Sequence, residues 1–432
     1  MDSMLNIPEP KHERVVVVGC GFAGLELAKR LRKSNFQVVL IDKNNYHQFQ
    51  PLFYQVATAG LEPRDISFPV RKIFHGYKNT FIRIAEVTKI TPETNTIETS
   101  IGSLTYNHLV LAQGATTSFF GLNNVEKYSL PMKNVVEALE ILNSILHNLE
   151  EALDSKSSEE IEALTNIVIV GGGPTGVELS GALAEMKRYV FPKDYPELDC
   201  NRIRIMLVES TNKLLGNLSA KSSEKSEKFL KRLGVEVMKN TLVLDYDGET
   251  VYLKDKEPIK SKMLIWAAGI KGSVIDGLPS DVFTKSFRIN VDKYNLVNGF
   301  ENIYALGDIA YMTTDKFPYG HPQVAQVAIQ SARNLANNLI LAKKGKTPSE
   351  FRYHDLGTMA TIGRNKAVVD LPYIKFQGIL AWFTWMFIHL RSIFGVKNKI
   401  LILINWMWSY ITYDQSLRLT FLPKHFRLSK ES

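Results

Sequence analysis

A strand, a glycine-rich turn and a helix follow one another twice in this sequence, and this repeat constrains the fold more than any other feature. The first copy consists of the β-branched run Arg14–Val18, the turn GCGFAG (residues 19–24) and a helical stretch to Arg32. The second copy consists of Asn166–Val170, the turn GGGPTG (residues 171–176) and the helical Val177–Tyr189. In each copy a further strand ends in an acid, Asp42 or Glu209. Two such βαβ units predict an α/β chain with two Rossmann-like, doubly wound domains.

The first glycine turn has the features of a dinucleotide site. A GxGxxG turn alone can start a helix and bind nothing, so the preceding strand, the following helix and the later acid are needed as support. Gly19 permits the tight turn, Gly21 lets the backbone approach a pyrophosphate, and Gly24 lets helix and strand pack closely. Free N–H groups at the helix start then face the phosphates. Asp42 is placed to accept hydrogen bonds from ribose hydroxyls.

The second glycine turn predicts a second dinucleotide. Gly171, Gly173 and Gly176 repeat the spacing, and Glu209 ends the next strand. An acid at this place favours a free ribose 2′-hydroxyl and repels a 2′-phosphate. NADH is therefore expected over NADPH, although Lys213, close to Glu209, leaves this preference open.

Two dinucleotide sites in one chain are explained by hydride transfer between a nicotinamide and a flavin. The segment ALGD (residues 305–308) supports the flavin, since Gly307 lets the backbone approach a ligand and Asp308 can bind a ribitol hydroxyl; an ordinary β-turn is the alternative. The strand-like Asn302–Ala310 is expected to return to the first domain, into which the second is then inserted. We expect an FAD-binding domain of residues 1–120 and 295–370, an NADH-binding domain of residues 121–294 and a C-terminal segment of residues 371–432.

Two connecting stretches are also interpreted. Phe81–Ile90 and Asn95–Ser100 are expected to form a small antiparallel meander. Glu150–Leu164 is charged and rich in serine, and we interpret it as the end of a helix followed by a linker.

The C-terminal segment has the composition of a membrane-binding element. From Leu371 onward the chain has eight Lys or Arg against two Asp or Glu, and four of its five Trp. Ile400–Tyr413 reads as a helix with one narrow polar stripe of Asn405, Ser409 and Thr412. In Phe376–Leu390, one apolar face is expected, made of Ile379, Trp382, Phe383, Met386 and Leu390. The basic flanks are Lys375, Arg391, Lys397, Lys399 and Arg418.

Apolar faces rich in Trp with basic edges suit a lipid interface, so we expect amphipathic helices that bind the bilayer surface. A buried helical hairpin or a dimer interface is the alternative. No run reaches the roughly 18 uninterrupted apolar residues of a membrane span. Nucleic acid is not expected as a partner, because the aromatic residues cluster with Leu and Ile and are not interleaved with the basic ones.

With these features the chain resembles the type II NADH:quinone oxidoreductases, also called alternative NADH dehydrogenases, which are flavoproteins with two dinucleotide domains. The most specific stretches are DKNNYHQFQPLFYQVATAGL (42–61), VAQVAIQSAR (324–333) and the tail from Gly378 to Tyr413. LAQGA (111–115) and WAAGI (266–270) are shared with many flavin reductases. The resemblance implies that hydride passes from NADH to FAD, and that two electrons then reduce a membrane quinone, menaquinone or ubiquinone, without proton pumping. We also expect a homodimer.

The resemblance also implies the site residues. Those expected at FAD are Gly19, Gly21, Gly24, Asp42, Lys43, Ala112, Gly114, Gly307 and Asp308. Those expected at NADH are Gly171, Gly173, Gly176, Glu209, Ala268 and Gly269. The catalytic candidates are Glu178, Gln326, Gln330 and Lys375.

Each catalytic candidate has a plainer interpretation. Gln326 and Gln330 would share one helix face and offer amides to a quinone or to the flavin edge, or they are two exposed glutamines. Lys375 lies near the quinone entrance or is a surface lysine at the membrane edge. Glu178 lies near flavin and nicotinamide, or is a favourable carboxylate in the first turn of a helix.

The cysteine content excludes several chemistries. Cys20 and Cys200 form no CxxC pair and cannot build a disulfide framework or a cysteine metal site, so no metal is expected and Cys20 is interpreted as packing. A sulfide:quinone oxidoreductase would need reactive cysteines near the flavin.

A slow or non-catalytic NADH-binding flavoprotein, like relatives of apoptosis-inducing factor, is the alternative from another class, and steady-state turnover distinguishes it. The first residues show no apolar signal region, so we expect a peripheral protein on the cytoplasmic face of the bacterial inner membrane.

Overall fold

The chain is divided into two units, each assembled from three separate stretches. A computed structural model describes residues 4–413, 418 and 419, so the rest of the predicted C-terminal segment lies outside the described residues. Unit 1 consists of Met1–Gln48, Phe68–Thr116 and Ile270–Asp355. Unit 2 consists of Phe49–Ser67, Thr117–Gly269 and Leu356–Ser432. The two glycine turns therefore belong to different units.

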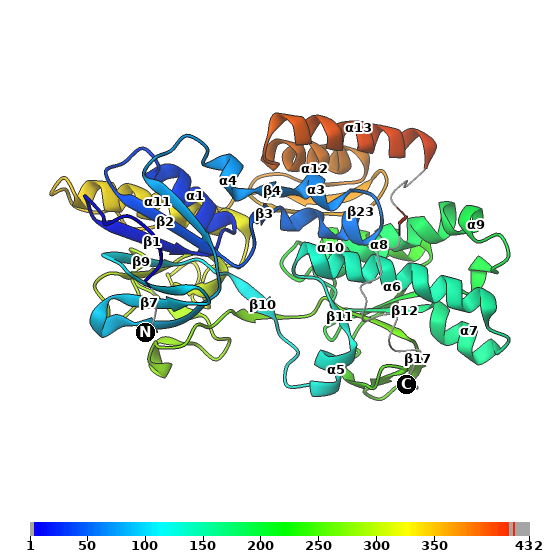
Figure 1. Cartoon of the computed structure of the whole chain (residues 1–432). Helices are drawn as coiled ribbons and strands as arrows, with labels where there is room; N and C mark the ends of the chain where they lie inside the picture. The colour runs from blue at the N-terminus through cyan, green and yellow to red at the C-terminus, as the bar shows by residue number, and fades with distance from the viewer. Residues whose placement is uncertain (1–3, 414–417, 420–432) are drawn as a thin grey trace. The chain divides into compact units, whose positions relative to one another are not determined.

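Unit 1 is built on a parallel five-stranded sheet in the order β21-β9-β1-β2-β5, with the strand before the first glycine turn at its centre. The strands are β1 (Arg14–Val18), β2 (Gln37–Asp42), β5 (Thr80–Ile84), β9 (His108–Leu111) and β21 (Ile303–Ala305). β1 is buried along its whole length, as expected for a parallel strand covered on both faces. Helices α1 (Phe22–Leu31) and α11 (Ala325–Ala342) lie side by side (Figure 1).

The return of the chain to unit 1 after the second glycine turn is confirmed, because β21 pairs with β9. The strand is shorter than the predicted Asn302–Ala310. Gly307 begins a 3-10 turn, η5 (Gly307–Ile309), which ends the extended backbone.

The expected meander at Phe81–Ile90 is corrected by the structure. Its first half is β5, which pairs parallel with β2, and only its second half, β6 (Val87–Thr91), joins the antiparallel sheet with β7 (Thr96–Thr99) and β8 (Gly102–Thr105). The N–H of Ala85 still donates to the carbonyl of Asp42, so the chain leaves the parallel sheet directly after it. Both halves have strand-like composition, which is why the pattern alone did not separate them.

Unit 2 repeats the arrangement around the second glycine turn. Its parallel sheet has the order β11-β18-β12-β13-β14. The strands are β11 (Leu130–Pro131), β12 (Asn166–Val170), β13 (Arg204–Val208), β14 (Glu236–Met238) and β18 (Met263–Trp266). The longer helices of its nucleotide-binding part are α6 (Val135–Asp154), α8 (Pro174–Tyr189) and α10 (Ala220–Leu233), and β15 (Val243–Tyr246), β16 (Thr250–Leu253) and β17 (Ile259–Lys260) form a small antiparallel sheet.

The predicted linker before β12 is wrong, because Glu150–Leu164 contains a second helix, α7 (Ser158–Thr165). The Ser157 hydroxyl accepts a hydrogen bond from the N–H of Glu160 and caps the helix start. A serine-rich, acidic stretch is typical of a linker and equally of a capped helix start, so composition was a poor guide here.

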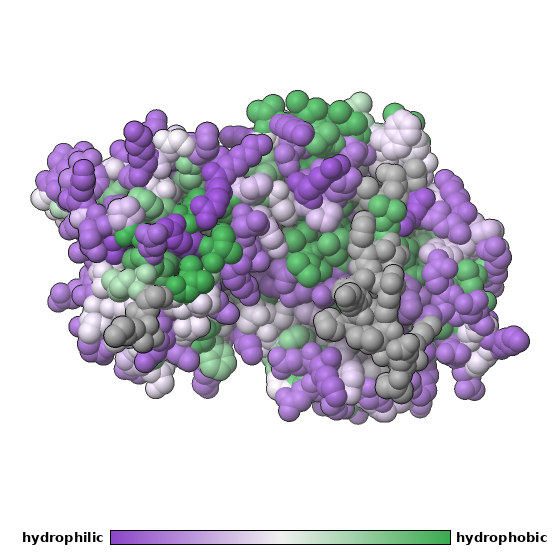
Figure 2. Space-filling model, in the orientation of Figure 1, coloured by the Kyte–Doolittle hydropathy of each residue, from purple (hydrophilic) through white to green (hydrophobic). Residues whose placement is uncertain are grey.

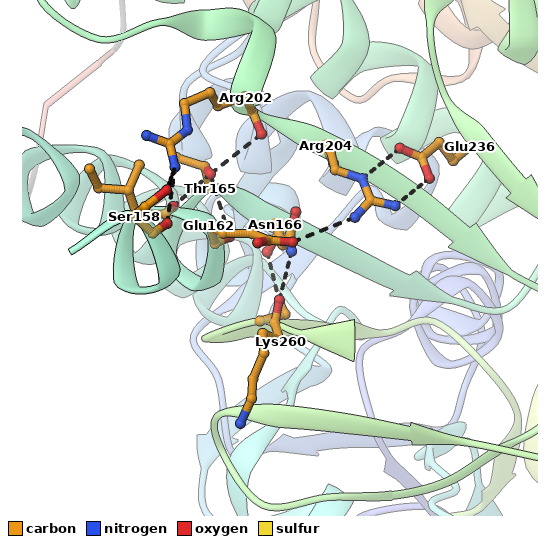
Figure 3. Close-up of polar contacts among 10 residues, drawn as sticks. Ser158, Glu162, Thr165, Asn166, Arg202, Arg204, Glu236 and Lys260 are labelled. Atoms are coloured by element: carbon orange, nitrogen blue, oxygen red, sulfur yellow. Dashed lines mark hydrogen bonds and ion pairs between the residues drawn. The ribbon is translucent and has the colours of Figure 1, made fainter. Parts of the chain in front are cut away.

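Polar side chains fix the edge of the unit 2 sheet at which its strands begin (Figure 3). Asn166, the first residue of β12, donates through Nδ2 to the Lys260 carbonyl at 2.7 Å. Arg204, the first residue of β13, forms a two-pronged pair with Glu236 at 2.8 and 2.7 Å. The glycine turn follows the opposite, carboxyl end of β12. The strand starts therefore carry structural polar contacts, and the strand ends are left for ligands.

The rest of unit 2 packs a β-hairpin against α8, and two helices follow the hairpin in the chain. The antiparallel strands are β23 (Thr358–Gly363), β24 (Lys366–Asp370) and β25 (Lys375–Gln377), and the helices are α12 (Ile379–Ser392) and α13 (Val396–Thr412). Gly181 makes the close packing possible, because a Cβ there would lie 2.6 Å from the Ile362 carbonyl oxygen. Among the described residues, no helix has both the length and the apolar character needed to cross a membrane.

Helix α13 has its polar side inward and its apolar side outward. Asn398 donates to the carbonyls of Arg64 and Asp65 in α3 (Pro63–Ile66), and Asn405 donates to the Asp65 carboxylate. The exposed side chains on the other side include Ile404, which is 55% exposed. The predicted polar stripe is thus the side that contacts the protein.

The apolar face predicted for α12 is exposed in part, because two of its members, Trp382 and Met386, line a cavity within unit 2. Ala381 and Trp385 are the buried positions, whereas Ile379 and Phe383 are exposed. The helix is apolar nearly all round, so periodicity could not select the side that packs.

The short elements complete the chain. They are β3 (Tyr46–Gln48), α2 (Phe53–Ala57), β4 (Ser67–Pro69), α4 (Val70–Ile73), β10 (Ala115–Thr117), α5 (Asn123–Tyr128), α9 (Phe191–Asp194), β19 (Ile270–Gly272), β20 (Ile289–Asn290) and β22 (Ala310–Tyr311).

Candidate functional site

The first glycine turn has the shape that a pyrophosphate requires. Gly19 has φ +97°, and a Cβ there would lie 2.5 Å from the Ala112 carbonyl oxygen. A Cβ on Gly24 would lie 1.9 Å from the Gly19 carbonyl oxygen, so this position also excludes a side chain. At Gly21 the nearest atom to a Cβ is 4.0 Å away, which leaves the backbone open to a ligand. The residues present therefore fit the phosphates of FAD.

Asp42 holds this turn in place. Its carboxylate accepts hydrogen bonds from the N–H of Cys20 at 2.6 Å and of Asn44 at 2.7 Å. Burial raises the pKa of Asp42, and these two amide bonds oppose the rise. Each oxygen keeps a lone pair that a ribose hydroxyl can use. Lys43, next in the chain, is exposed.

Two buried side chains support the same turn. Cys20 is 2% exposed, and burial raises the pKa of its thiol well above the usual value, in agreement with a packing role. Nδ1 of His47 lies 2.8 Å from the Cys20 carbonyl oxygen. Burial lowers the pKa of His47 to about 4, so this imidazole is neutral at pH 7.

The predicted flavin turn lies beside the same helix start. Gly307 has φ +70°, and a Cβ there would lie 3.2 Å from Cβ of Ala328 and 3.4 Å from Cβ of Ala23. Nε2 of Gln323 donates to the Asp308 carbonyl at 2.9 Å. The turn is therefore packed between α1 and α11 and positioned by the segment leading into α11. Ala112 is buried below the first glycine turn, and Gly114 has φ +74°.

The two glutamines of α11 differ in their contacts. Nε2 of Gln330 donates to the His354 carbonyl at 2.9 Å, and Oε1 of Gln330 accepts from the His354 N–H at 3.0 Å. Gln326, one turn earlier, has no side-chain hydrogen bond within the described part of the chain. Gln330 thus fixes the segment around His354, and Gln326 has the amide that is available to a substrate.

The second glycine turn matches the first in detail. Gly171 has φ +112°, and a Cβ there would lie 2.7 Å from the Ala267 carbonyl oxygen. A Cβ on Gly176 would lie 2.0 Å from the Gly171 carbonyl oxygen, and the space at Gly173 is open. The Glu209 carboxylate accepts from the N–H of Gly172 and of Thr211, both at 2.7 Å. This cradle fits the phosphates of NADH as the first one fits those of FAD.

The question left open by Lys213 has a structural answer. Its ammonium donates to the Gly216 carbonyl at 3.1 Å and to the Leu218 carbonyl at 2.5 Å. A lysine held by two carbonyls is occupied within its own loop and is a poor partner for a 2′-phosphate.

Gly269, which follows Ala268, packs closely against an aromatic ring. It has φ +73°, and a Cβ there would lie 2.3 Å from the Phe120 ring.

Glu178 is not a carboxylate in the first turn of a helix, because no acidic residue lies in the first turn of α8. It lies in the second turn and is 8% exposed, with Oε1 accepting from the Thr361 N–H at 3.2 Å. Burial raises the pKa of Glu178 to about 8, while the Thr361 N–H and the nearby Trp385 side chain oppose the shift. Glu178 is therefore a carboxylic acid that holds its proton at pH 7.

Lys375, the other catalytic candidate of unit 2, is exposed on β25, opposite Asp370 of β24.

A cavity of about 110 Å³ lies within unit 2, and Thr361 and Trp385, the neighbours of Glu178, are part of its wall. Its walls come from α2, β23, α12 and α13, and they include Tyr54, Gln55, Glu185, Arg364 and Trp406. Nε2 of Gln55 donates to the Tyr54 hydroxyl, and Nε1 of Trp406 donates to Oε1 of Gln55, both at 2.8 Å. Sequence reasoning missed these residues. Only Glu185 had a usable signal, since it lies seven residues after Glu178 and so on the same face of a helix.

The comparisons with known proteins agree with this geometry. Residues 13–332 match the pyridine nucleotide-disulphide oxidoreductase family, and residues 355–412 match the NDH2 C-terminal domain. A type II NADH:quinone oxidoreductase (Ndh) of Mycobacterium tuberculosis is 31% identical over 93% of this chain and 89% of its own. An internal alternative NAD(P)H-ubiquinone oxidoreductase of Solanum tuberosum mitochondria is 29% identical over 92% and 86%.

Solved structures show the same fold. NDH2 from Plasmodium falciparum in complex with NADH has a TM-score of 0.87 at 22% identity, covering 95% of this chain and all of that one. The sulfide:quinone oxidoreductase of Aquifex aeolicus has a TM-score of 0.70 at 19% identity, covering 97% and 95%.

The two parallel sheets, each with its glycine cradle and acid, define a pyridine nucleotide-disulphide oxidoreductase with two dinucleotide sites. Within that class, the match over nearly the whole chain and the additional C-terminal domain are decisive. The chain belongs to the type II NADH:quinone oxidoreductase family. It is an FAD-dependent enzyme that oxidises NADH and reduces a quinone without pumping protons.

Proposed function

We propose that this NADH:quinone oxidoreductase works as a peripheral protein on a membrane surface and meets its quinone there. The observation that carries the proposal is the outward apolar side of α12 and α13, visible as the green area over these helices in Figure 2. The exposed side chains are Ile379, Leu380, Phe383, Phe387, Val396, Ile400, Leu403, Ile404, Met407, Trp408 and Ile411. An exposed apolar area of this extent marks a site of interaction, and a quinone is itself dissolved in lipid.

The charges beside these helices support a lipid partner. Lys375, Arg391 and Lys397 are exposed near their ends, where they can reach anionic headgroups. Arg418 has a different role, because its guanidinium pairs with Asp194 of α9 at 2.5 Å. Relatives from Mycobacterium tuberculosis and Staphylococcus aureus are named type II NADH:quinone oxidoreductases, which supports a quinone as the electron acceptor. We propose that the enzyme lies on the cytoplasmic face of a bacterial inner membrane, with menaquinone or ubiquinone as the quinone.

The roles proposed for the site residues follow from their contacts. The first glycine cradle would hold FAD, which would supply a carrier able to take hydride from NADH and return two electrons to the quinone. The second cradle and Glu209 hold NADH. Gln326 offers a free amide to a quinone carbonyl, and Gln330 positions the segment around His354. Glu178 is the buried acid that can give and take a proton, and Lys375 lies at the lipid side of unit 2.

The membrane proposal is tested with vesicles. Met407→Asp places a charge on the outward side of α13, where the wild-type side chain is 56% exposed. We expect the variant to stop sedimenting with phosphatidylglycerol vesicles, while its reduction of a water-soluble quinone stays intact. Leu244→Asp, at an exposed position on β15, is the matched control. Persistent sedimentation of the Met407 variant at high salt would contradict the proposal. Sedimentation equilibrium in detergent tests the expected homodimer.

A further inference from the structure

The stoichiometry of the reaction requires a proton from the medium. NADH gives up two electrons with one hydrogen nucleus, whereas the reduction of a quinone to its quinol takes two electrons and two protons. The balance is NADH plus quinone plus one proton giving NAD⁺ plus quinol. Each turnover therefore takes up one proton, which must pass from water into a site where dinucleotide and quinone exclude the solvent.

Two carboxyl groups on α8 are placed for such a transfer. Glu178 and Glu185 are seven residues apart, so they lie on one face of the helix, about 10 Å apart along its axis. Both accept a hydrogen bond from the same β-hairpin. Glu178 accepts from the Thr361 N–H at 3.2 Å, and Glu185 accepts from the Arg364 N–H at 2.6 Å. Gly181, halfway between them, brings α8 into contact with that hairpin.

The 110 Å³ cavity connects Glu185 with the side chains that surround Glu178. Glu185 itself lines it, and so do Tyr54, Thr361 and Trp385, which are the neighbours of Glu178. The wall also carries polar groups of Gln55, Thr58, Ser409 and Tyr410. A polar cavity of this volume has room for several hydrogen-bonded waters, since one water needs roughly 10–15 Å³ of such space.

The Glu185 end of the cavity lies near the surface. Arg364, beside it, donates to the carbonyls of Ser409 and Tyr410 at 2.6 and 2.8 Å and so holds the end of α13. The Tyr410 side chain, on the same wall, is 40% exposed. Glu178, in contrast, is buried, and it lies behind the cavity wall formed by Thr361 and Trp385.

The charges around Glu185 suit a group that binds and releases protons. Burial raises the pKa of Glu185, while the Arg364 N–H and the positive charges of Arg364 and Lys366 oppose the rise. Tyr54 and Tyr410 are titratable groups in the same cavity wall. Burial holds the pKa of the Tyr54 phenol well above its usual value, so Tyr54 stays neutral. Glu178 has no cation of this kind among the groups that shift it.

We propose that Glu185 is the entry carboxyl of a proton path that runs through the unit 2 cavity to Glu178. A proton from water binds Glu185, crosses the waters of the cavity and replaces the proton that Glu178 gives to the reaction. No electron moves in this step and no bond other than O–H is formed or broken. The inference rests on the proposed role of Glu178 as the inner acid. Glu185 acts through Glu178 and is therefore a positioning residue.

The test is Glu185→Gln, which keeps the carbonyl that accepts from Arg364 and removes the titrating proton. Its direct readout is hydrogen–deuterium exchange of the protonated Glu178 carboxyl, followed by infrared spectroscopy after mixing the FAD-loaded enzyme with D₂O. The band is assigned from its loss in Glu178→Gln. We expect exchange to slow by about tenfold or more in Glu185→Gln, to recover in Glu185→Asp, and to be unchanged in Glu162→Gln, an exposed glutamate of α7.

Kinetics provide the second readout. Reduction of the flavin by NADH takes up no proton from the path, so its rate should stay within about twofold of wild type, whereas quinone reduction and dye-detected proton uptake should slow on the order of 100-fold. Unchanged carboxyl exchange in Glu185→Gln would overturn the proposal. Equal slowing of both half-reactions would overturn it as well, because it would show a structural role. Failure of the wild-type enzyme to protonate Glu178 would refute the role proposed for Glu178 separately.

Discussion

Replacing Glu178 by Gln should remove a pH dependence of stability that the wild-type protein carries. Burial raises the pKa of this carboxyl from the ordinary 4.5 to about 8. The unfolded chain loses the proton near the ordinary value, and the folded protein keeps it to about the raised one. Between these values the folded state binds more protons, so the free energy of unfolding falls as the pH rises.

The size of the effect follows from the shift. Each pH unit inside the window changes the free energy of unfolding by about 1.4 kcal/mol. With a native pKa of about 8, Glu178 should lower wild-type stability by about 3.5 kcal/mol between pH 5 and pH 8. The lowering of the free energy of unfolding by Glu178 is complete only above the raised pKa, where it reaches about 5 kcal/mol. Gln has no proton to lose, so its curve lacks this component.

The assay is denaturant unfolding of the FAD-loaded protein in one detergent, followed by circular dichroism at each pH unit from 5 to 8. Wild type, Glu178→Gln and the exposed control Glu162→Gln are compared, so that all other titrating groups cancel. The difference between wild type and Glu178→Gln should grow with pH, while the control stays parallel to wild type. A difference constant to about 0.5 kcal/mol across the range would refute a buried, protonated Glu178.

Three further predictions concern packing, docking and specificity. Gly181→Ala should destabilise the protein by about 2 kcal/mol and lower its melting temperature, because the new Cβ meets the Ile362 carbonyl at 2.6 Å. Arg364→Lys should speed amide hydrogen exchange in α13, because lysine cannot serve both carbonyls with the fork of arginine. Glu209→Gln should narrow the preference for NADH over NADPH about tenfold in kcat/KM, because a repelling charge is removed.

The first two of these predictions have matched controls. Gly216→Ala should leave the melting temperature unchanged, since no atom lies within 4 Å of the new Cβ. Arg232→Lys, on the last turn of α10, should leave the exchange in α13 unchanged. Unaltered coenzyme preference in Glu209→Gln would remove the electrostatic role of Glu209. A Gly181→Ala protein as stable as wild type would show that the hairpin yields to α8 at no cost.

The nucleotide-binding framework could be predicted because its determinants are local. A β-branched strand, a glycine at positive φ and an acid after the next strand specify each cradle within a few dozen residues. Gly24 and Gly176 show how strict the spacing is, since a Cβ at either would lie 1.9 or 2.0 Å from the carbonyl oxygen of the first glycine of its turn, far inside van der Waals contact. The sequence also carries the return of Ile303–Ala305 to the first sheet as a buried strand.

The inner acid and its cavity could not be predicted, because they depend on contacts distant in sequence. Glu178 is buried by Thr361 and Trp385, about 180 and 200 residues later. Nothing in the local pattern separates such a residue from a carboxylate at a helix start. The protein partners of the polar side of α13 could not be predicted for a related reason. A polar stripe normally faces water, and only the partners Arg64 and Asp65 show that here it faces protein.

The polar side of α13 faces the protein and its apolar side faces outward, and this arrangement has a consequence for the folding of a newly made chain. The carbonyls of Arg64 and Asp65 are in position only after α3 has folded, so α3 must form before α13 can pack against it. Until the protein meets lipid, the outward side of the helix is apolar surface in water, the kind of surface that chaperones hold and that aggregates when left free. Overproduction beyond the lipid surface that a cell can offer should therefore yield insoluble protein, even though unit 1 has a complete core of its own.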